Sequence, residues 1–173
     1  MQFLKTTLLV FIVSLAAIVS KAQRLSPAAT ATGTLANGAN ITIKYSSPSV
    51  RGREIYGTEL VPYNQVWRAG ANEATTFETD KDIKVEGKAL PAGKYSIYMI
   101  ASEKDWVIIF NSKTGQWGIN RDHSTTEDPA NDVIRVTVTP KKSASMTESL
   151  VYKINGDGML MSWEWLDVAV GMK

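Results

Sequence analysis

Hydrophobic and polar residues alternate with a period of two along much of the chain, which is the pattern of half-buried β-strands. Residues 41–45 alternate strictly and end at a Ser-Ser-Pro turn. Residues 133–139 repeat the pattern, and Ile134, Val136 and Val138 are predicted to point inward. Further strands are expected at 75–79, 82–86, 94–100 and 106–110. Beyond the first residues no segment keeps a period of 3.6, so the pattern predicts no long helix.

Two segments carry the strongest strand signals. The apolar, β-branched run 106–110 predicts a central strand that is covered on both faces. Residues 148–154 and 159–166 flank the sequence Asn-Gly-Asp-Gly, which predicts a hairpin. Four large apolar side chains of the second hairpin strand are spaced by two and are predicted to share one core face: Met159, Met161, Trp163 and Trp165.

Short strands separated by Gly, Pro and Asn turns predict an all-β fold, a single antiparallel β-sandwich or jelly-roll-like barrel over residues 40–173. Residues 23–39 are small and polar and are expected to form a flexible lead-in. Ser49 to Tyr56 is expected to extend the first strand past a bulge, and residues 60–67 to form a loop with one helical turn. Residues 111–132 are one long polar insertion.

The N-terminus has the pattern of a secretory signal. Lys5 precedes a short apolar run, and Ser20-Lys21-Ala22 offers small residues at a cleavage site, so residues 1–22 are predicted to be removed. A retained membrane anchor is the alternative, but the run is shorter than the roughly 20 residues that span a bilayer. We therefore expect a periplasmic or secreted protein with no membrane span after cleavage.

Charge and cysteine content narrow the function classes. The chain has 19 basic and 17 acidic residues, and removing Lys5 and Lys21 leaves 17 of each (19 minus 2). A neutral chain with no basic cluster has no electrostatic basis for binding nucleic acid. The absence of cysteine excludes disulfides, thiolate metal ligands and a lipoprotein anchor, and no cofactor is expected.

Residues 67–73 concentrate the chemistry of the chain. They place Trp67, Arg68, Asn72 and Glu73 around Gly70, just ahead of a strand. One interpretation is a site for a small anionic or polyol ligand, bound by the Arg and Asn side chains and stacked on the indole. The other is a structural brace, in which Arg68 pairs internally with Glu73 or another acid and Gly70 supplies a positive φ.

Four other residues belong to the same hypothesis or compete with it. Trp117, in a loop, either closes one end of the sandwich or lines a pocket there, and Arg51 and Arg53 are outer ligand-binding candidates.

His123 lies among Asp122, Glu127, Asp128 and Asp132, but a single histidine favours a solvated acidic loop over a metal site. No Gly-x-Ser-x-Gly motif supports a serine triad. Glu73 and Glu164 are the carboxylates that a hydrolase would use.

Several motifs together resemble a known family. They are Ser47-Pro48-Ser49-Val50-Arg51-Gly52-Arg53, Val61-Pro62-Tyr63, the run from Val66 to Thr75, Leu90-Pro91-Ala92-Gly93-Lys94-Tyr95-Ser96, Gln116-Trp117-Gly118 and the closing Ser162-Trp163-Glu164. From about Ile41 to the C-terminus the chain is similar to the exported bacterial family called domain of unknown function 2911. The resemblance implies an exported, mostly β, single-domain protein and supplies no activity. Residues 119–132 look longer and more polar than that family's pattern.

The expected function is a non-catalytic binding or envelope-associated module for a small polar or carbohydrate ligand. The alternatives are a carboxylate-dependent hydrolase acting on an envelope or glycan substrate, with Glu73 as its first candidate, and a structural protein in which the Arg68 motif is only a brace. The sequence does not indicate an oligomeric state.

Overall fold

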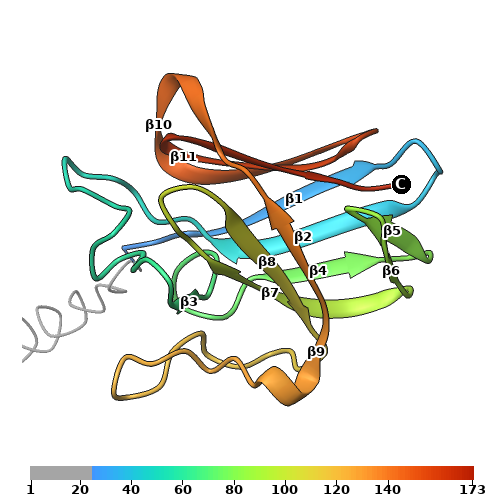
Figure 1. The fold of residues 1–173 in the computed structure, drawn as a ribbon, viewed down its shortest axis with the longest axis horizontal. Helices are drawn as coiled ribbons and strands as arrows, with labels where there is room; N and C mark the ends of the chain where they lie inside the picture. The colour runs from blue at the N-terminus through green and yellow to red at the C-terminus, as the bar shows by residue number, and fades with distance from the viewer. Residues whose placement is uncertain (1–24) are drawn as a thin grey trace, which may run out of the picture.

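Three β-sheets form two layers that pack face to face in the computed structural model of the protein, which describes residues 25–173 (Figure 1). The all-β prediction is confirmed, and the only helical segment of the described residues is a single 3-10 turn, η1 (Pro129–Asn131). The predicted signal peptide and its cleavage site lie outside the described residues. No helix in residues 25–173 is long and apolar enough to cross a membrane.

The larger sheet is antiparallel and has seven strands. Its spatial order is β1 (Ala28–Thr34), β2 (Asn40–Ser46), β4 (Thr76–Thr79), β7 (Gly93–Ile100), β8 (Trp106–Asn111) and β9 (Asp132–Val138). A short strand, β3 (Val66–Trp67), pairs with the end of β7 that extends beyond β4. The continuous apolar run therefore forms an interior strand, β8, as predicted.

The second layer is built around the long hairpin of β10 (Lys141–Asn155) and β11 (Gly158–Gly171), which lies over β1 and β2 in Figure 1. The small hairpin of β5 (Ile83–Val85) and β6 (Lys88–Leu90) joins it where Val85 pairs with Met172. On the other side, Ser49 pairs with Ser149. This last contact draws the segment that follows β2 onto the edge of β10.

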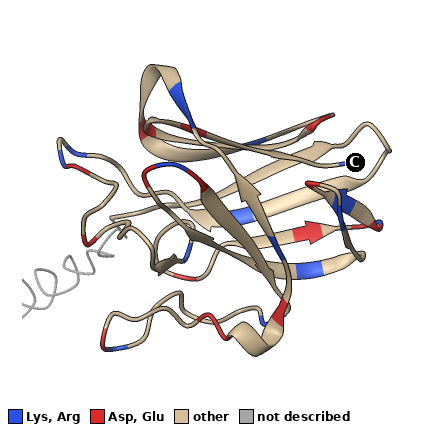
Figure 2. Cartoon of the chain, in the orientation of Figure 1, with Lys and Arg blue, Asp and Glu red and all other residues tan. Residues whose placement is uncertain are grey.

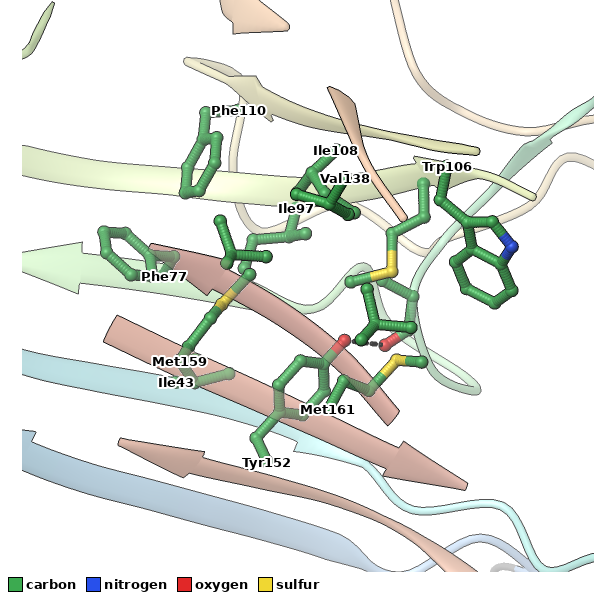
Figure 3. Close-up of a cluster of buried hydrophobic side chains, with 14 of the residues drawn as sticks. Ile43, Phe77, Ile97, Trp106, Ile108, Phe110, Val138, Tyr152, Met159 and Met161 are labelled. Carbon is green, nitrogen blue, oxygen red and sulfur yellow. Dashed lines mark hydrogen bonds between the residues drawn. The ribbon is translucent and has the colours of Figure 1, made fainter. Parts of the chain in front are cut away.

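The core between the two layers consists of inward-facing side chains at alternate strand positions (Figure 3). Phe77 and Phe110 meet edge to face with their ring centroids 5.1 Å apart. Tyr152 lies beside Met159 and Met161 in Figure 3, and its phenol is buried, which raises its pKa well above the usual range. Because the chain has no cysteine, its stability rests on this packing and not on disulfides.

The expectation of a flexible lead-in over residues 23–39 is wrong for residues 28–34, which form β1. All seven residues of β1 pair with β2, from Ala28 opposite Ser46 to Thr34 opposite Asn40. The side chains of Ala29 and Ala31 pack against the core. Alanine and threonine give a weak hydrophobic contrast, so the alternation that marks β1 was not visible in the sequence.

The segment between β2 and β3 also differs from its prediction. Residues 51–65 form neither a strand nor a helical turn, because the chain bends at Arg51 (φ 53°) and Gly52 (φ 68°). Tyr56 and Val61 form an isolated bridge within this loop. The loop projects from the end of the sandwich at which β3 lies, on the left of Figure 1.

The period of two predicted that Trp165 shares the core face of Met159, Met161 and Trp163. This prediction is wrong for Trp165. Trp163 is 2% exposed and Trp165 is 47% exposed. Glu164, between them, has a φ of 54°, and the β10–β11 register shifts beside it. This bulge exchanges the two faces of β11.

The long segment between β8 and β9 covers the outer face of the larger sheet, opposite β10 and β11 (gold in Figure 1). Beneath it, Ala74, Tyr98 and Ile109 form a second, smaller apolar cluster. Gln116 donates a hydrogen bond from Nε2 to the Tyr98 hydroxyl at 2.8 Å. The segment is therefore a packed part of the fold over much of its length.

Candidate functional site

A pocket of about 180 Å³ lies where β3, the loop after β2 and β11 meet. Arg51, Arg53 and Arg68 line it, and Trp67 and Trp163 form apolar walls. No acidic residue of the described chain lines it, which makes it a concentration of positive charge on a chain whose charges are otherwise interspersed (Figure 2). We call it the arginine pocket.

Arg51 and Arg53 are held by main-chain carbonyls. Arg51 donates from Nη2 to the Leu25 carbonyl at 2.9 Å, and Arg53 donates from Nε to the Val50 carbonyl at 3.0 Å. A second Arg53 bond runs from Nη2 to the Ser49 carbonyl at 2.7 Å. Carbonyl partners orient a guanidinium without neutralising it, and neither arginine forms an ion pair with any residue from 25 to 173.

Arg68 is half-buried and makes no ion pair within the described chain. Its Nε is buried and has no hydrogen-bond partner. Burial lowers the pKa of the guanidinium from its ordinary value, but arginine stays protonated in proteins. An unsatisfied buried donor is unfavourable by about 1–3 kcal/mol, so the fold tolerates Arg68 here rather than gaining from it.

A second unsatisfied donor belongs to the same pocket. Trp163 is 2% exposed, and its Nε1 is also buried without a hydrogen-bond partner. Its ring stacks on Trp67 with an interplanar angle of 14° and a centroid distance of 6.0 Å. Unpaired buried donors are rare in native proteins, and two of them occur among the residues that line this pocket.

The turn that carries Arg68 is strained. Ala69 and Asn72 have positive φ angles of 55° and 57°. The Ala69 carbonyl accepts hydrogen bonds from the Thr75 hydroxyl (2.9 Å) and the Tyr152 hydroxyl (2.8 Å), which fix this conformation from two sides. Backbone strain of this kind is often retained at binding sites.

The prediction that Gly70 supplies the positive φ of this turn is wrong, since Gly70 is not among the residues with positive φ. Glycine is required here for space. A Cβ at this position would lie 2.8 Å from Thr75 Oγ1 and 3.1 Å from the Ser46 carbonyl oxygen. The close approach brings the turn against the end of β2.

Asn72, Glu73 and Trp117 do not line the arginine pocket. Asn72 donates from Nδ2 to the Ser26 carbonyl at 3.1 Å, and Glu73 and Trp117 form a bridge between their backbones. The Glu73 side chain is exposed and lines a shallow hollow on the larger sheet, beside Lys44 and Lys94. The predicted cluster is thus divided between two surfaces.

The carboxylate arrangements considered from the sequence are not assembled. Within residues 25–173 no ion pair joins Arg68 to Glu73, so the internal pair of the brace hypothesis is absent. Glu73 is the only acidic residue of the described chain that lines its hollow. Glu164 lies instead at the bulge of β11.

The His123 loop forms one wall of an open groove, which we call the loop groove. The groove runs between residues 57–65 and residues 119–125. His123 has a positive φ of 69°, and the Ser124 hydroxyl donates to Asp122 Oδ1 at 2.6 Å. This bond lowers the pKa of Asp122, so the carboxylate stays ionised.

The other acids near His123 are engaged elsewhere. Arg135 pairs with Glu127 at 3.0 Å and with Asp132 at 2.6 Å. Burial, together with the neighbouring Asp132 carboxylate, raises the pKa of Glu127. Asp128 accepts a hydrogen bond from the Ala130 amide at the start of η1. No group of three metal-ligating residues forms in residues 25–173.

Sequence reasoning about residues 67–73 missed two residues that shape the arginine pocket. Trp163 appeared only as a core residue and as part of a closing motif, and its unpaired Nε1 has no sequence signal. Gly118 appeared only as the neighbour of Trp117. It is buried against the Arg68 side chain, and a Cβ there would overlap Arg68 Cδ and lie 2.8 Å from Arg68 Cβ.

Substituting Gly118→Ala is expected to displace Arg68 and to destabilise the protein by about 1–3 kcal/mol, because the new methyl group overlaps the stem of the arginine. Chemical denaturation measures the change. Gly156→Ala is the matched control, since its Cβ would meet nothing closer than the Ala36 amide nitrogen at 3.8 Å. Equal stability of the two variants would contradict the packing of Gly118 on Arg68.

The sequence of the chain matches a known protein family. Residues 26–173 match the model of a family described as "Protein of unknown function (DUF2911)". No curated protein and no solved structure matches the chain. The matched region includes every strand of the fold, β1 among them.

Proposed function

Because the chain belongs to the DUF2911 family, whose function is unknown, we propose a function from the geometry of the arginine pocket: non-catalytic binding of a small anionic ligand. The observation that carries the proposal is the half-buried Arg68 guanidinium, which has no carboxylate partner within residues 25–173 and a buried Nε without an acceptor. A carboxylate or phosphate group in the pocket would supply the missing negative charge.

The rest of the pocket supports the same chemistry. Arg51 and Arg53 add two guanidinium groups that main-chain carbonyls already orient. Groups that are held in place before the ligand arrives lose little conformational entropy on binding. Trp67 and Trp163 provide apolar walls, which lower the local dielectric and strengthen the ionic contact.

We also propose that the protein acts outside the cytoplasm, in the periplasm or as a secreted protein. The support is the signal pattern of residues 1–22. An exported protein with a preorganised anion pocket fits a binding or envelope-associated role.

The substitution Arg68→Met tests the proposal, because it keeps an apolar stem and removes the charge. Titration calorimetry with acetate and with inorganic phosphate should show saturable binding to the wild type. Binding should weaken by at least about tenfold in Arg68→Met, since a hydrogen bond to a charged group contributes about 1.5–3 kcal/mol. The free energy of unfolding should stay equal or rise by about 1 kcal/mol, because an unsatisfied buried donor is removed.

Lys153→Gln is the control, since it removes one positive charge at an exposed position of β10. It should bind both anions as the wild type does. If Arg68→Met is instead strongly destabilised and neither anion binds the wild type, the motif is a structural brace and the proposal is wrong.

A further inference from the structure

The arginine pocket adjoins the loop groove. Leu60, Trp67 and Arg68 line both the pocket and the inner part of the groove, whose volume is about 350 Å³. The inner part shares Glu59 and His123 with an outer part of about 950 Å³. A ligand anchored at Arg68 therefore has the groove between the two loops directly beside it.

The arginine pocket and the outer part of the loop groove carry opposite charges. The arginine pocket has three guanidinium groups and no acid among the described residues that line it. The outer groove has Glu59 and Asp122, and no lysine or arginine of the described chain lines it. Asp122 stays ionised because Ser124 donates to it. Charge complementarity thus favours a ligand with an anionic end and a cationic group some distance along it.

The lining of the outer groove favours a peptide over a sugar chain. Sugar rings commonly stack on exposed aromatic side chains, but no Trp, Tyr or Phe of the described chain lines the outer groove, and the exposed Trp117 is not part of it. Gln65 lies along the groove, and its amide both donates and accepts hydrogen bonds. A peptide backbone presents the same two functions in turn.

We propose, building on the anion-binding function above, that the ligand is a short peptide bound through its C-terminal carboxylate at Arg68. A basic side chain upstream in the peptide lies at Glu59 and Asp122. Recognition of a free carboxylate by an arginine fork is a common way to select chain ends. The strained turn at Ala69 holds Arg68 in the position that this mode requires.

The experiment compares three fluorescently labelled peptides by anisotropy at low salt: lysyl-alanyl-leucine with a free carboxylate, its C-terminal amide, and the glutamyl analogue of the free acid. Each peptide carries the dye at its N-terminal end. The free acid of the lysyl peptide should bind best. The amide should bind at least about tenfold more weakly, because the ionic contact to Arg68 is lost. The glutamyl acid should bind about two- to fivefold more weakly, as expected for an exposed charge pair.

Glu59→Gln combined with Asp122→Asn should abolish the preference for lysyl over glutamyl peptide, while acetate still binds. Glu103→Gln, at an exposed position outside the groove, should leave the preference intact. If acetate binds but the peptide amide equals the acid, or if a uronic-acid trisaccharide binds more tightly than the lysyl peptide, the peptide assignment is wrong and the anion pocket stands. If no anion binds, the proposed function itself fails.

Discussion

Replacing Gly158 by alanine should destabilise the protein by at least about 3 kcal/mol, one of the two largest effects expected of any substitution considered. Gly158 begins β11, and its φ of 145° is one that residues with a side chain rarely adopt. A Cβ there would overlap the Val170 carbonyl oxygen and lie 2.9 Å from the Met172 amide nitrogen. Both are backbone atoms, so no side-chain rotation relieves the overlap.

The backbone next to Gly158 has no freedom to move. The Met172 amide donates to the Asp157 carbonyl at 2.8 Å, and Met172 also pairs with Val85 of β5. A shift at Gly158 would therefore separate the end of β11 from the β5–β6 hairpin. Since whole domains are stable by only about 5–15 kcal/mol, Gly158→Ala should be partly unfolded at moderate temperature.

Urea denaturation of Gly158→Ala and Gly156→Ala side by side measures this effect. Gly156 lies in the same turn and does not have a positive φ. A Cβ added there would lie 3.8 Å from its nearest neighbour, the Ala36 amide nitrogen. The Gly156→Ala variant should be within about 1 kcal/mol of the wild type. Equal, small losses in both variants would show that the close passage of β11 over the turn does not constrain the fold.

The sequence predicts the strands whose inward residues are large. Ile41 and Ile43 in β2, and Val136 and Val138 in β9, contrast with polar neighbours, so one face of each strand can be identified without knowing its partner. β1 lacks this contrast because Ala29 and Ala31 are small. Its strand conformation depends on pairing with β2, which is a property of the assembled sheet.

For the arginine pocket too, the sequence indicates individual residues but not which of them come together in the fold. Arg51, Arg53, Arg68 and Trp67 could be named from the sequence, because their chemistry is unusual for loop and turn positions. That the three arginines meet, and that Asn72, Glu73 and Trp117 lie elsewhere, depends on where the chain turns. The bend at Arg51 and Gly52 and the pairing of Ser49 with Ser149 set that position.

Trp163→Ala should destabilise the protein by about 3–5 kcal/mol, whereas Trp165→Ala should change its stability by no more than about 0.5 kcal/mol. The two residues are two positions apart in β11, and a strictly alternating strand would place them on one face. The bulge at Glu164 separates them, so that Trp163 is 2% exposed and Trp165 is 47% exposed. A comparison of the pair tests the bulge directly.

The large effect at Trp163 has several physical sources. Its ring stacks on Trp67 and meets the Tyr56 ring edge to face with a centroid distance of 6.3 Å. Removing the indole leaves a cavity under the arginine pocket and withdraws the support of Trp67. Thermal unfolding gives the loss of stability, and a larger loss in Trp165→Ala would overturn the assignment of faces in β11.

Trp163→Phe separates the two roles of this indole. Phenylalanine keeps most of the buried apolar surface but removes Nε1, which has no hydrogen-bond partner among residues 25–173. We expect the stability of Trp163→Phe to be closer to that of the wild type than to that of Trp163→Ala. A drop in acetate or phosphate affinity without a matching drop in stability would show that the indole N–H contacts the anion, because packing alone would change both together.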